Sequence, residues 1–417
     1  MPVGASCDRE AAPIPTTTDS SPRADCIIAL VAGEPSGDQL GRGLMAALRA
    51  RCPDVRFIGI GGPGMQAEGL ASLAPIEQLS VNGLVDPMLK LPALLRLERM
   101  LIDQCRHHRV AAFIGIDFNV FNLRLERRLR RQGVRTVHYV SPSVYAWRRG
   151  RTRRVAAAAD LLLALFPFEP ALYAGLDLRV VCVGHRLADA IDPDRDRVAE
   201  QRAARAMLGL PTSADVVALL PGSRASEVMR MAPVLAEAAG IMLAKRPETR
   251  FVVPCIRPAV RDIMIRTLSP QLASRFTWVD GRARDTLAAS DAAIVKSGTS
   301  TLEAMLMGCP MVVTYKLGGL TYRIVRALLR TPWVSLPNIL AGRAIVPELL
   351  QDAATPAALA SALLAQLDRA RIDDALRQTF LELHRSLRRD ADRTAARAVL
   401  HLIDPHMAPM DDRDGVA

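Results

Sequence analysis

Short apolar runs alternate with helix-like patterns along most of the chain. Six runs come first, at residues 26–32, 55–61, 111–116, 135–141, 160–166 and 178–184, and five more follow at residues 215–222, 250–255, 276–281, 292–298 and 310–315. Buried strands that alternate with amphipathic helices are typical of parallel α/β domains. The pattern therefore predicts an α/β fold with two Rossmann-like domains that face a cleft.

Composition shifts mark the expected domain boundaries. Residues 1–24 are rich in Pro, Thr, Ser and Ala without an apolar signal region, so they predict a flexible N-terminal extension. The charged, Pro-containing stretch Asp192–Ala206 separates the two sets of runs and predicts a linker followed by the first helix of the second domain. We expect a first domain at residues 25–191, a second at 192–384, and in 385–417 a C-terminal helix that returns to the first domain before a tail.

Charge and composition narrow the classes of partner. The 417-residue chain is half apolar and has a formal net charge of +11, carried almost entirely by arginine. Such a balance suits phosphorylated substrates, acidic membranes or nucleic acid. Aromatic residues make up only 4% of the chain and no RNA-binding or zinc-finger signature occurs, which disfavours nucleic acid. Seven scattered cysteines without CxxC spacing predict buried thiols in the cytoplasm, and no apolar run is long enough to span a bilayer.

One strand of the second set ends in a turn that suits an anion. The stretch LLPGSRASEV, Leu219–Val228, predicts a strand, a tight turn at Pro221–Ser223 and a helix that begins near Ala225. Backbone N–H groups and the dipole of a helix N-terminus attract phosphate, and Arg224 would add a forked donor. A solvent-exposed turn with a solvated arginine is the alternative.

A second turn of the same build follows another strand of that set. The stretch SGTSTLEAMLMG, Ser297–Gly308, places small residues before a helix and Glu303 within its first turns. A carboxylate there can accept hydrogen bonds from ribose hydroxyls while the turn binds phosphate. An N-capped helix with Glu303 favouring the helix dipole is the alternative for this turn alone. Two such turns in one domain favour a nucleotide diphosphate.

The first set of strands carries acidic turns. The stretch VAGEPSGDQLG, Val31–Gly41, repeats the strand, turn and helix, but Glu34 and Asp38 make it better suited to a hydroxyl-rich ligand than to phosphate. Asp117 directly follows the run at residues 111–116, where a carboxylate would face the cleft and could act as a general base. A helix N-cap is the alternative for Asp117.

Two further polar groups have weaker interpretations. His138, Ser141 and Ser143 lie at the next strand end, but no GxSxG elbow surrounds either serine, so an orienting role for the histidine is favoured over a nucleophile pair. The alternating aspartates of residues 192–196 resemble a metal-binding DxD motif, yet the charged linker predicts a solvated surface there. We expect no metal ion and no cofactor.

A basic amphipathic helix is predicted near residues 84–102, LVDPMLKLPALLRLERMLI. Its apolar positions at helical spacing are Leu84, Val85, Met88, Leu91, Leu94 and Leu95. Lys90, Arg96 and Arg99 lie beside them, so the helix suits an anionic membrane surface, whereas a core helix is the alternative.

Seven segments resemble the lipid-A-disaccharide synthases, glycosyltransferase family 19, in order and spacing over residues 26–404. They are VAGEPSGDQLG, GIGGPGMQAEG, HYVSPSVYAWRRGR, LPGSR, SGTSTLE, PMVV and SLPNILAGR. The resemblance implies a glycosyltransferase fold of the B type and an inverting transfer. It implies UDP-2,3-diacylglucosamine as donor, 2,3-diacylglucosamine 1-phosphate (lipid X) as acceptor, and lipid A disaccharide 1-phosphate and UDP as products.

The resemblance also implies roles for single residues. Donor-binding residues would be Ser223, Arg224, Ser297, Gly298, Thr299, Ser300, Thr301, Glu303, Asn338 and Arg343. Asn338 and Arg343 would line the cleft, and Glu34 and Asp117 would belong to the acceptor side, with Asp117 the preferred base and Glu34 its rival. The lipid substrates imply peripheral association with the inner membrane of a Gram-negative bacterium. The oligomeric state stays open, with a dimer as one option.

Three departures from the family pattern qualify the resemblance. Members usually read GIDAPDFN where this chain reads GIDFNVFN, so Phe118, Asn119 and Val120 replace Ala, Pro and Asp. Ala344 stands where a Glu is common, and Asn82 where a Met is frequent. Another UDP-sugar transferase, a UDP-sugar 2-epimerase and a catalytically silent lipid- or nucleotide-binding paralogue are the alternative functions.

Overall fold

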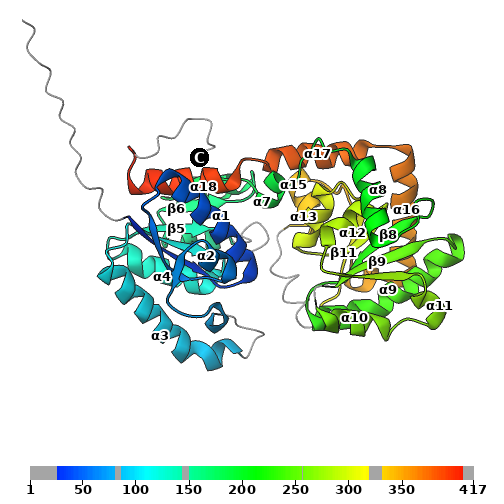
Figure 1. The fold of residues 1–417 in the computed structure, drawn as a ribbon, viewed down its shortest axis with the longest axis horizontal. Coiled ribbons are helices and arrows are strands. Elements are labelled where there is room, and N and C mark those ends of the chain that lie inside the picture. The colour runs from blue at the N-terminus through cyan, green and yellow to red at the C-terminus, as the bar shows by residue number, and fades with distance from the viewer. Residues whose placement is uncertain (1–25, 80–85, 143–149, 256, 319–330, 407–417) are drawn as a thin grey trace, which may run out of the picture.

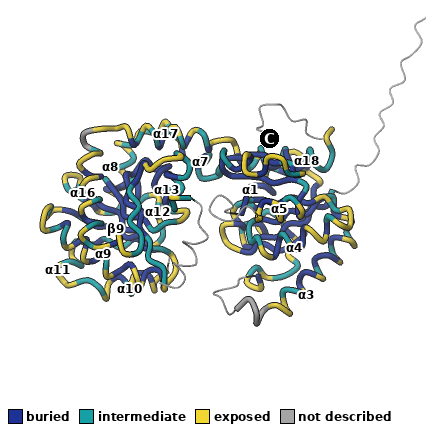
Figure 2. The backbone as a smooth tube through the Cα atoms, turned by 180° about the vertical axis from the view of Figure 1, so that it is seen from behind, coloured by how far each residue is buried: buried dark blue, intermediate teal, exposed yellow. Residues whose placement is uncertain are grey.

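The computed structural model describes residues 26–79, 86–142, 150–255, 257–318 and 331–406. These residues form two lobes, each built around one sheet (Figure 1). Buried residues follow the strands of both lobes, and exposed residues lie on the surrounding helices and loops (Figure 2). We call the lobe of the first sheet the first lobe and that of the second sheet the second lobe.

The first sheet has seven parallel strands in the order β3-β2-β1-β4-β5-β6-β7. The strands are β1 (Ile27–Ala32), β2 (Arg56–Ile60), β3 (Leu70–Ser72), β4 (Ala112–Ile116), β5 (Arg135–Tyr139), β6 (Leu161–Ala164) and β7 (Arg179–Cys182). The chain builds outward from β1 in one direction and from β4 in the other. The junction between β1 and β4 is therefore the point where the strand order reverses.

Helices cover both faces of the first sheet because its strands are apolar on both sides. Leu30 of β1 belongs to the same buried cluster as Leu44, whereas the next residue, Val31, belongs to the opposite cluster with Leu101 and Leu125. The helical elements are α1 (Pro35–Arg51), α2 (Pro63–Ala67), η1 (Ile76–Gln78), α3 (Asp86–His107), α4 (Asn119–Arg130), α5 (Gly150–Ala156), α6 (Glu169–Leu172) and α7 (Arg186–Ala190).

The second sheet has six parallel strands in the order β10-β9-β8-β11-β12-β13, and its order reverses between β8 and β11. The strands are β8 (Val216–Leu220), β9 (Arg250–Cys255), β10 (Phe276–Asp280), β11 (Ala292–Lys296), β12 (Met311–Tyr315) and β13 (Glu348–Leu350). The helical elements are α8 (Arg197–Leu208), α9 (Ala225–Lys245), α10 (Pro258–Ile265), α11 (Pro270–Ala273), α12 (Ala283–Ala289), α13 (Thr299–Leu306), α15 (Leu336–Ala341), η2 (Gln351–Ala353) and α16 (Pro356–Ile372).

The last two helices join the lobes. Helix α17 (Ala375–Leu387) crosses from the second lobe toward the first, and α18 (Ala391–Ile403) packs along α1 (Figure 1). The close approach needs Gly43, because a Cβ there would overlap the Asp392 carboxylate, which also pairs with Arg186 at 3.2 Å. The Asp189 carboxylate accepts hydrogen bonds from the backbone N–H groups of Asp390 and Ala391, which fixes the start of α18.

The structure confirms the α/β fold and all eleven predicted strands. It adds β3 and β13, each three residues long, which have too few positions for a periodic pattern. The domain boundaries drawn from composition stay predictions. The N-terminal extension and the tail after residue 406 lie outside the described residues. Among the described helices, none is long and apolar enough to cross a membrane.

Candidate active site

A cavity of about 680 Å³ lies between the two lobes. The first lobe contributes Asp117, which follows β4, and His185 and Arg186, which open α7. The second lobe contributes the Gly298-Thr299 turn after β11. Burial lowers the pKa of His185 to about 4, and its Nδ1 accepts the backbone N–H of Leu187, so this imidazole is neutral at neutral pH. The cavity thus has a carboxylate on one side and a helix N-terminus on the other.

The first predicted anion turn, Pro221–Ser223 with Arg224, has the strand before it and the helix after it that the sequence predicts. Strand β8 ends at Leu220, and α9 begins at Ala225 with Arg224 as its N-cap residue. Gly222 has a φ of +119°, a conformation that glycine adopts readily and other residues rarely do. Ser223 and Arg224 are both exposed at the N-terminus of this 21-residue helix. The turn can therefore offer backbone N–H groups and a guanidinium to a phosphate.

The second predicted anion turn, Ser297–Thr301, is stabilised by hydrogen bonds from its own side chains. The Thr301 hydroxyl donates to the carbonyl of Gly298 at 2.8 Å, and the Ser297 hydroxyl donates to the carbonyl of Val334 at 3.0 Å. Thr301 is completely buried, whereas Gly298 and Thr299 are exposed and Ser300 is half-buried. Ser297 and Thr301 thus position the turn, and the residues between them can face a ligand.

Glu303 lies one helical turn further along α13. Burial raises the pKa of its carboxyl, and the positive charge of Arg284 partly opposes that shift. Arg284 lines the cavity, whereas Glu303 is not among the residues that line it.

A buried ion pair ties the two turns together, and the sequence analysis missed it. The Lys296 ammonium, at the end of β11, lies 3.1 Å from a carboxylate oxygen of Glu227 in the first turn of α9. Glu227 is only 6% exposed, and Lys296 also lies 4.7 Å from the centre of the Tyr315 ring. Lys296 is one of only four lysines in an arginine-rich chain, which is the signal that could have drawn attention to it.

Asn338 does not line the cleft, so that expectation is wrong. Its side chain is completely buried and its amide is fully used. The Nδ2 group donates to the Val346 carbonyl and to Glu348, and Oδ1 accepts the N–H groups of Ile345 and Val346. Glu348 also accepts from the backbone N–H groups of residues 334 and 335. Asn338 therefore holds the loop beside the cavity, and Arg343 is exposed and absent from the residues that line it.

A chain of polar side chains leads from Asp117 into the first lobe. Asn119 donates from Nδ2 to Asp117 Oδ1 at 3.2 Å, and its Oδ1 lies 3.0 Å from His138 Nε2. His138 Nδ1 lies 2.8 Å from Glu126, and both of these side chains are fully buried. Burial raises the pKa of Asp117, while the charge of His138 acts in the opposite direction. Asp117 itself adopts a φ of +51°, outside the usual region for a non-glycine residue.

The orienting interpretation of His138 agrees with these contacts. Both ring nitrogens face Asn119 and Glu126, and the Ser141 hydroxyl instead lies 2.8 Å from the Tyr173 hydroxyl. Ser143, the other predicted partner, lies outside the described residues. The structure thus gives no Ser–His pair among the residues it describes here.

The remaining acidic candidates separate into different roles. Glu34 is the exposed N-cap residue of α1, without a side-chain capping bond. Asp38 is buried and accepts the backbone N–H groups of Gly64 and Met65, so it ties α1 to α2. In the linker, Asp196 caps α8 and Asp194 pairs with Arg385. Across the described ranges, no three His, Cys, Asp or Glu side chains gather as metal ligands would.

Helix α3 is only partly a core helix. Leu97 and Leu101 are buried, whereas Leu94 and Leu95 are half-buried and Leu91 is 48% exposed. Residue 85 lies outside the described residues, as do the side chains of residues 86–90, including Met88. Leu91 therefore exposes apolar surface, whereas Leu97 and Leu101 further along α3 are buried.

Comparison with known proteins shows the family. The chain matches the family model described as Lipid-A-disaccharide synthetase over residues 28–399. The chain belongs to this family. It is 51% identical over 379 residues to the lipid-A-disaccharide synthase of Azotobacter vinelandii, a match that covers 90% of this chain and 98% of that protein. It is 50% identical over 378 residues to the synthase of Pseudomonas aeruginosa PAO1, with the same coverage of both chains.

Solved structures with little sequence identity share the fold of this family member. MurG from Acinetobacter baumannii has a TM-score of 0.54 at 14% identity and covers 91% of this chain and 99% of its own. A UDP-GlcNAc 2-epimerase from Neisseria meningitidis bound to UDP-GlcNAc has a TM-score of 0.55 at 9% identity and covers 90% and 99%. Both support the B-type glycosyltransferase fold. Family membership, in contrast, makes the chain a glycosyltransferase of lipid A biosynthesis.

The geometry predicts different consequences for Asn338 and Arg343. Asn338→Ala should lower the free energy of unfolding by about 2–4 kcal/mol, because it leaves several buried polar partners without a hydrogen bond. Arg343→Ala should stay within about 0.5 kcal/mol, since the side chain is exposed. Chemical denaturation of both variants measures this. Equally small decreases in the free energy of unfolding for both variants would contradict the buried role of Asn338.

Proposed function

We propose that this lipid-A-disaccharide synthase family member transfers a diacylglucosaminyl group from UDP-2,3-diacylglucosamine to the 6-hydroxyl of 2,3-diacylglucosamine 1-phosphate with inversion. The products are lipid A disaccharide 1-phosphate and UDP. The observation that carries the proposal is the cavity whose walls hold Asp117 on the first lobe and the Gly298-Thr299 turn on the second. An inverting displacement needs a base and a leaving-group site on opposite sides of the reacting carbon.

The second lobe supplies the leaving-group side. Both of its anion turns follow strands at the reversal of the sheet order, where ligands bind in open α/β sheets. Ser223, Arg224 and the Ser297–Thr301 turn would hold the diphosphate through N–H groups and the guanidinium. Glu303 would accept hydrogen bonds from the ribose, and Arg343 would contact the donor from the edge of the cleft. The turns stabilise the charge that develops on UDP as the glycosidic bond breaks.

The first lobe supplies the base. Asp117 would take the proton from the acceptor hydroxyl as that oxygen attacks the anomeric carbon. Burial raises the pKa of Asp117, which makes its carboxylate a stronger proton acceptor than an exposed one. Asn119 fixes the carboxylate through Oδ1, so the base keeps one orientation. Glu34 is the rival base on the same lobe.

The transfer reaction and Arg224 can be tested together. Incubation with both proposed substrates should release UDP and form the disaccharide. Arg224→Ala should reduce kcat/KM by about one to two decades, because a charge-assisted phosphate contact contributes about 1.5–3 kcal/mol. Arg202→Ala, an exposed arginine on α8, is the matched control. Wild-type protein that consumes neither substrate would overturn the proposed reaction, and a folded Arg224→Ala variant with normal kinetics would overturn the role of Arg224.

We expect substitutions of Asp117 and Glu34 to change the kinetics differently. Asp117→Asn should lower kcat by about two to four decades with little change in UDP affinity, because a missing base slows only the chemical step. Glu34→Gln should keep kcat near that of the wild type. Because the pKa of Asp117 is raised and the base must be ionised, wild-type kcat should fall on the acidic side from a pH above the ordinary carboxyl range. A loss of kcat confined to Glu34→Gln would assign the base to Glu34.

We also propose peripheral association with an anionic membrane through the basic amphipathic segment, with Val85, Met88, Leu91, Leu94 and Leu95 as its apolar contact residues. The exposed Leu91 lies on the same helix as exposed Arg96 and Arg99, the combination that interfacial helices use. Leu91→Glu should weaken sedimentation with phosphatidylglycerol vesicles at low salt. Met207→Glu, at a 49% exposed position on α8, should leave it unchanged. Equal binding by wild type and Leu91→Glu would exclude this surface as the contact.

A further inference from the structure

A second cavity, of about 660 Å³, lies on the first lobe between α4 and α5. Arg124, Arg127, Arg128 and Arg131 line it from α4 and the residue after it. Arg151, Arg153 and Arg154 line it from α5. No Asp or Glu is among the described residues that line it. We call this cavity the arginine groove.

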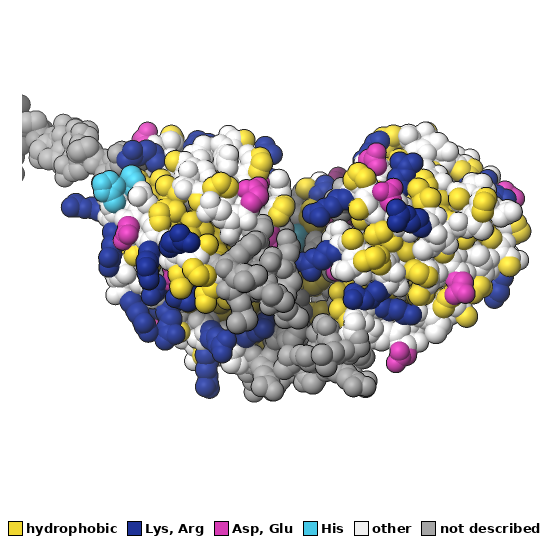
Figure 3. All heavy atoms as spheres, turned by 90° about the horizontal axis from the view of Figure 1, so that it is seen from below, with side chains coloured by type: hydrophobic (Ala, Val, Ile, Leu, Met, Phe, Trp, Pro, Cys, Tyr) yellow, Lys and Arg dark blue, Asp and Glu magenta, His cyan; other side chains and the backbone are white. Residues whose placement is uncertain are grey.

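One carboxylate beside the arginine groove pairs with two of its arginines. The nearly buried carboxylate of Glu98 pairs with both Arg124 and Arg128, so two guanidinium groups share one negative charge. All seven arginines that line the groove are exposed. Figure 3 shows Lys and Arg side chains on the faces of both lobes, including the lobe drawn on the left, which is the first lobe. Seven arginines without a carboxylate among the described lining residues give the groove a positive field that attracts an anion.

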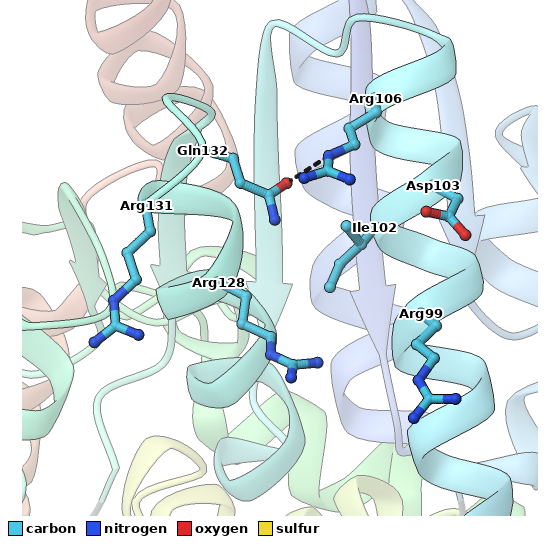
Figure 4. Close-up of a pocket in the computed structure, with 7 residues that line it drawn as sticks. All are labelled: Arg99, Ile102, Asp103, Arg106, Arg128, Arg131 and Gln132. Carbon is cyan, nitrogen blue, oxygen red and sulfur yellow. Dashed lines mark hydrogen bonds between the residues drawn. The ribbon is translucent and has the colours of Figure 1, made fainter.

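A neighbouring hollow between α3 and α4 provides a contrast. Arg99, Asp103 and Arg106 line it from α3, and Arg106 donates to the Gln132 side chain at 2.9 Å (Figure 4). That hollow contains a carboxylate as well as arginines, so its charge is mixed. Arg131 lines both cavities and points away from α3 in Figure 4. Of these two cavities, only the arginine groove has arginines and no carboxylate among its described lining residues.

The groove also has an apolar wall. Val120 is 90% exposed, which is unusual for a valine, and it lines the groove together with Leu123, Pro142 and Ala157. A guanidinium binds phosphate oxygens through paired donors, and apolar side chains suit a hydrocarbon chain beside them. The combination suits a phosphate monoester carried on a lipid better than a soluble sugar phosphate.

Asn119 connects the arginine groove to the candidate base. Its side chain lines the groove and donates to Asp117 Oδ1 at 3.2 Å. A sugar whose hydroxyl lies at Asp117 would therefore extend its substituents toward the groove. We infer that the arginine groove binds the phosphate monoester of the lipid acceptor and selects phosphorylated over dephosphorylated acceptors. This inference rests on the proposed function, which supplies the acceptor.

The test compares acceptors with and without the phosphate. In the double variant Arg127→Ala/Arg153→Ala, KM for the phosphorylated acceptor should rise about tenfold to a hundredfold, the effect of losing charge-assisted contacts. The donor KM and kcat/KM for the dephosphorylated acceptor should stay unchanged. The double Arg→Lys variant should recover only part of the preference, since lysine cannot donate in a fork. Arg202→Ala should match the wild type.

Equal losses on both acceptors, or an unchanged preference in the double Ala variant, would overturn the inference. If the wild-type protein shows no transfer, that result refutes only the proposed function. A binding measurement then tests the arginine groove by itself. Neutral detergent micelles doped with phosphatidic acid, a monoester, should bind the full chain at least tenfold more tightly than micelles doped with phosphatidylglycerol, a diester with less charge. The double Ala variant should lose this difference. Equal binding of both lipids by the wild type would overturn the groove as a monoester site.

Discussion

The parallel pairing of the strands is the constraint on which the candidate site depends. In a parallel sheet every strand ends at the same edge, so the chain must return through a helix before each new strand. Where the strand order reverses, the neighbouring turns diverge and leave a crevice. The turns with Glu34 and Asp117 flank that point in the first sheet, and those with Arg224 and Ser297 flank it in the second. Topology thus places two turns from separate stretches of sequence side by side in each lobe.

Buried polar contacts then fix the turns in position. The Glu227–Lys296 pair joins the two anion turns, and the Asn338–Glu348 network holds the loop beside them. Buried groups of this kind are costly unless each has a partner, so they allow few alternative arrangements. In the cavity between the lobes, Asp117 lies on the first lobe and the Gly298-Thr299 turn lies on the second.

The departure of this chain from its family pattern acquires a physical meaning in the structure. Phe118 packs against the backbone of Gly33, where an added Cβ would overlap its ring. Asn119 takes the bridging position between Asp117 and His138, and Val120 is exposed on the wall of the arginine groove. Asn119 and Val120 therefore connect the candidate base to the groove, where they can influence the orientation of an acceptor.

The sequence by itself determined the fold class, the eleven longer strands and the positions of the four turns. These features are local, because they depend on apolar periodicity and on glycine or small residues at strand ends. Only the tertiary structure decided that Asn338 is buried, that Lys296 meets Glu227, and that arginines of α4 and α5 line one groove. Those contacts join residues that are distant in the chain, and their partners follow from strand order and helix packing. A one-dimensional pattern carries no information about that order, whereas burial and electrostatics depend on it completely.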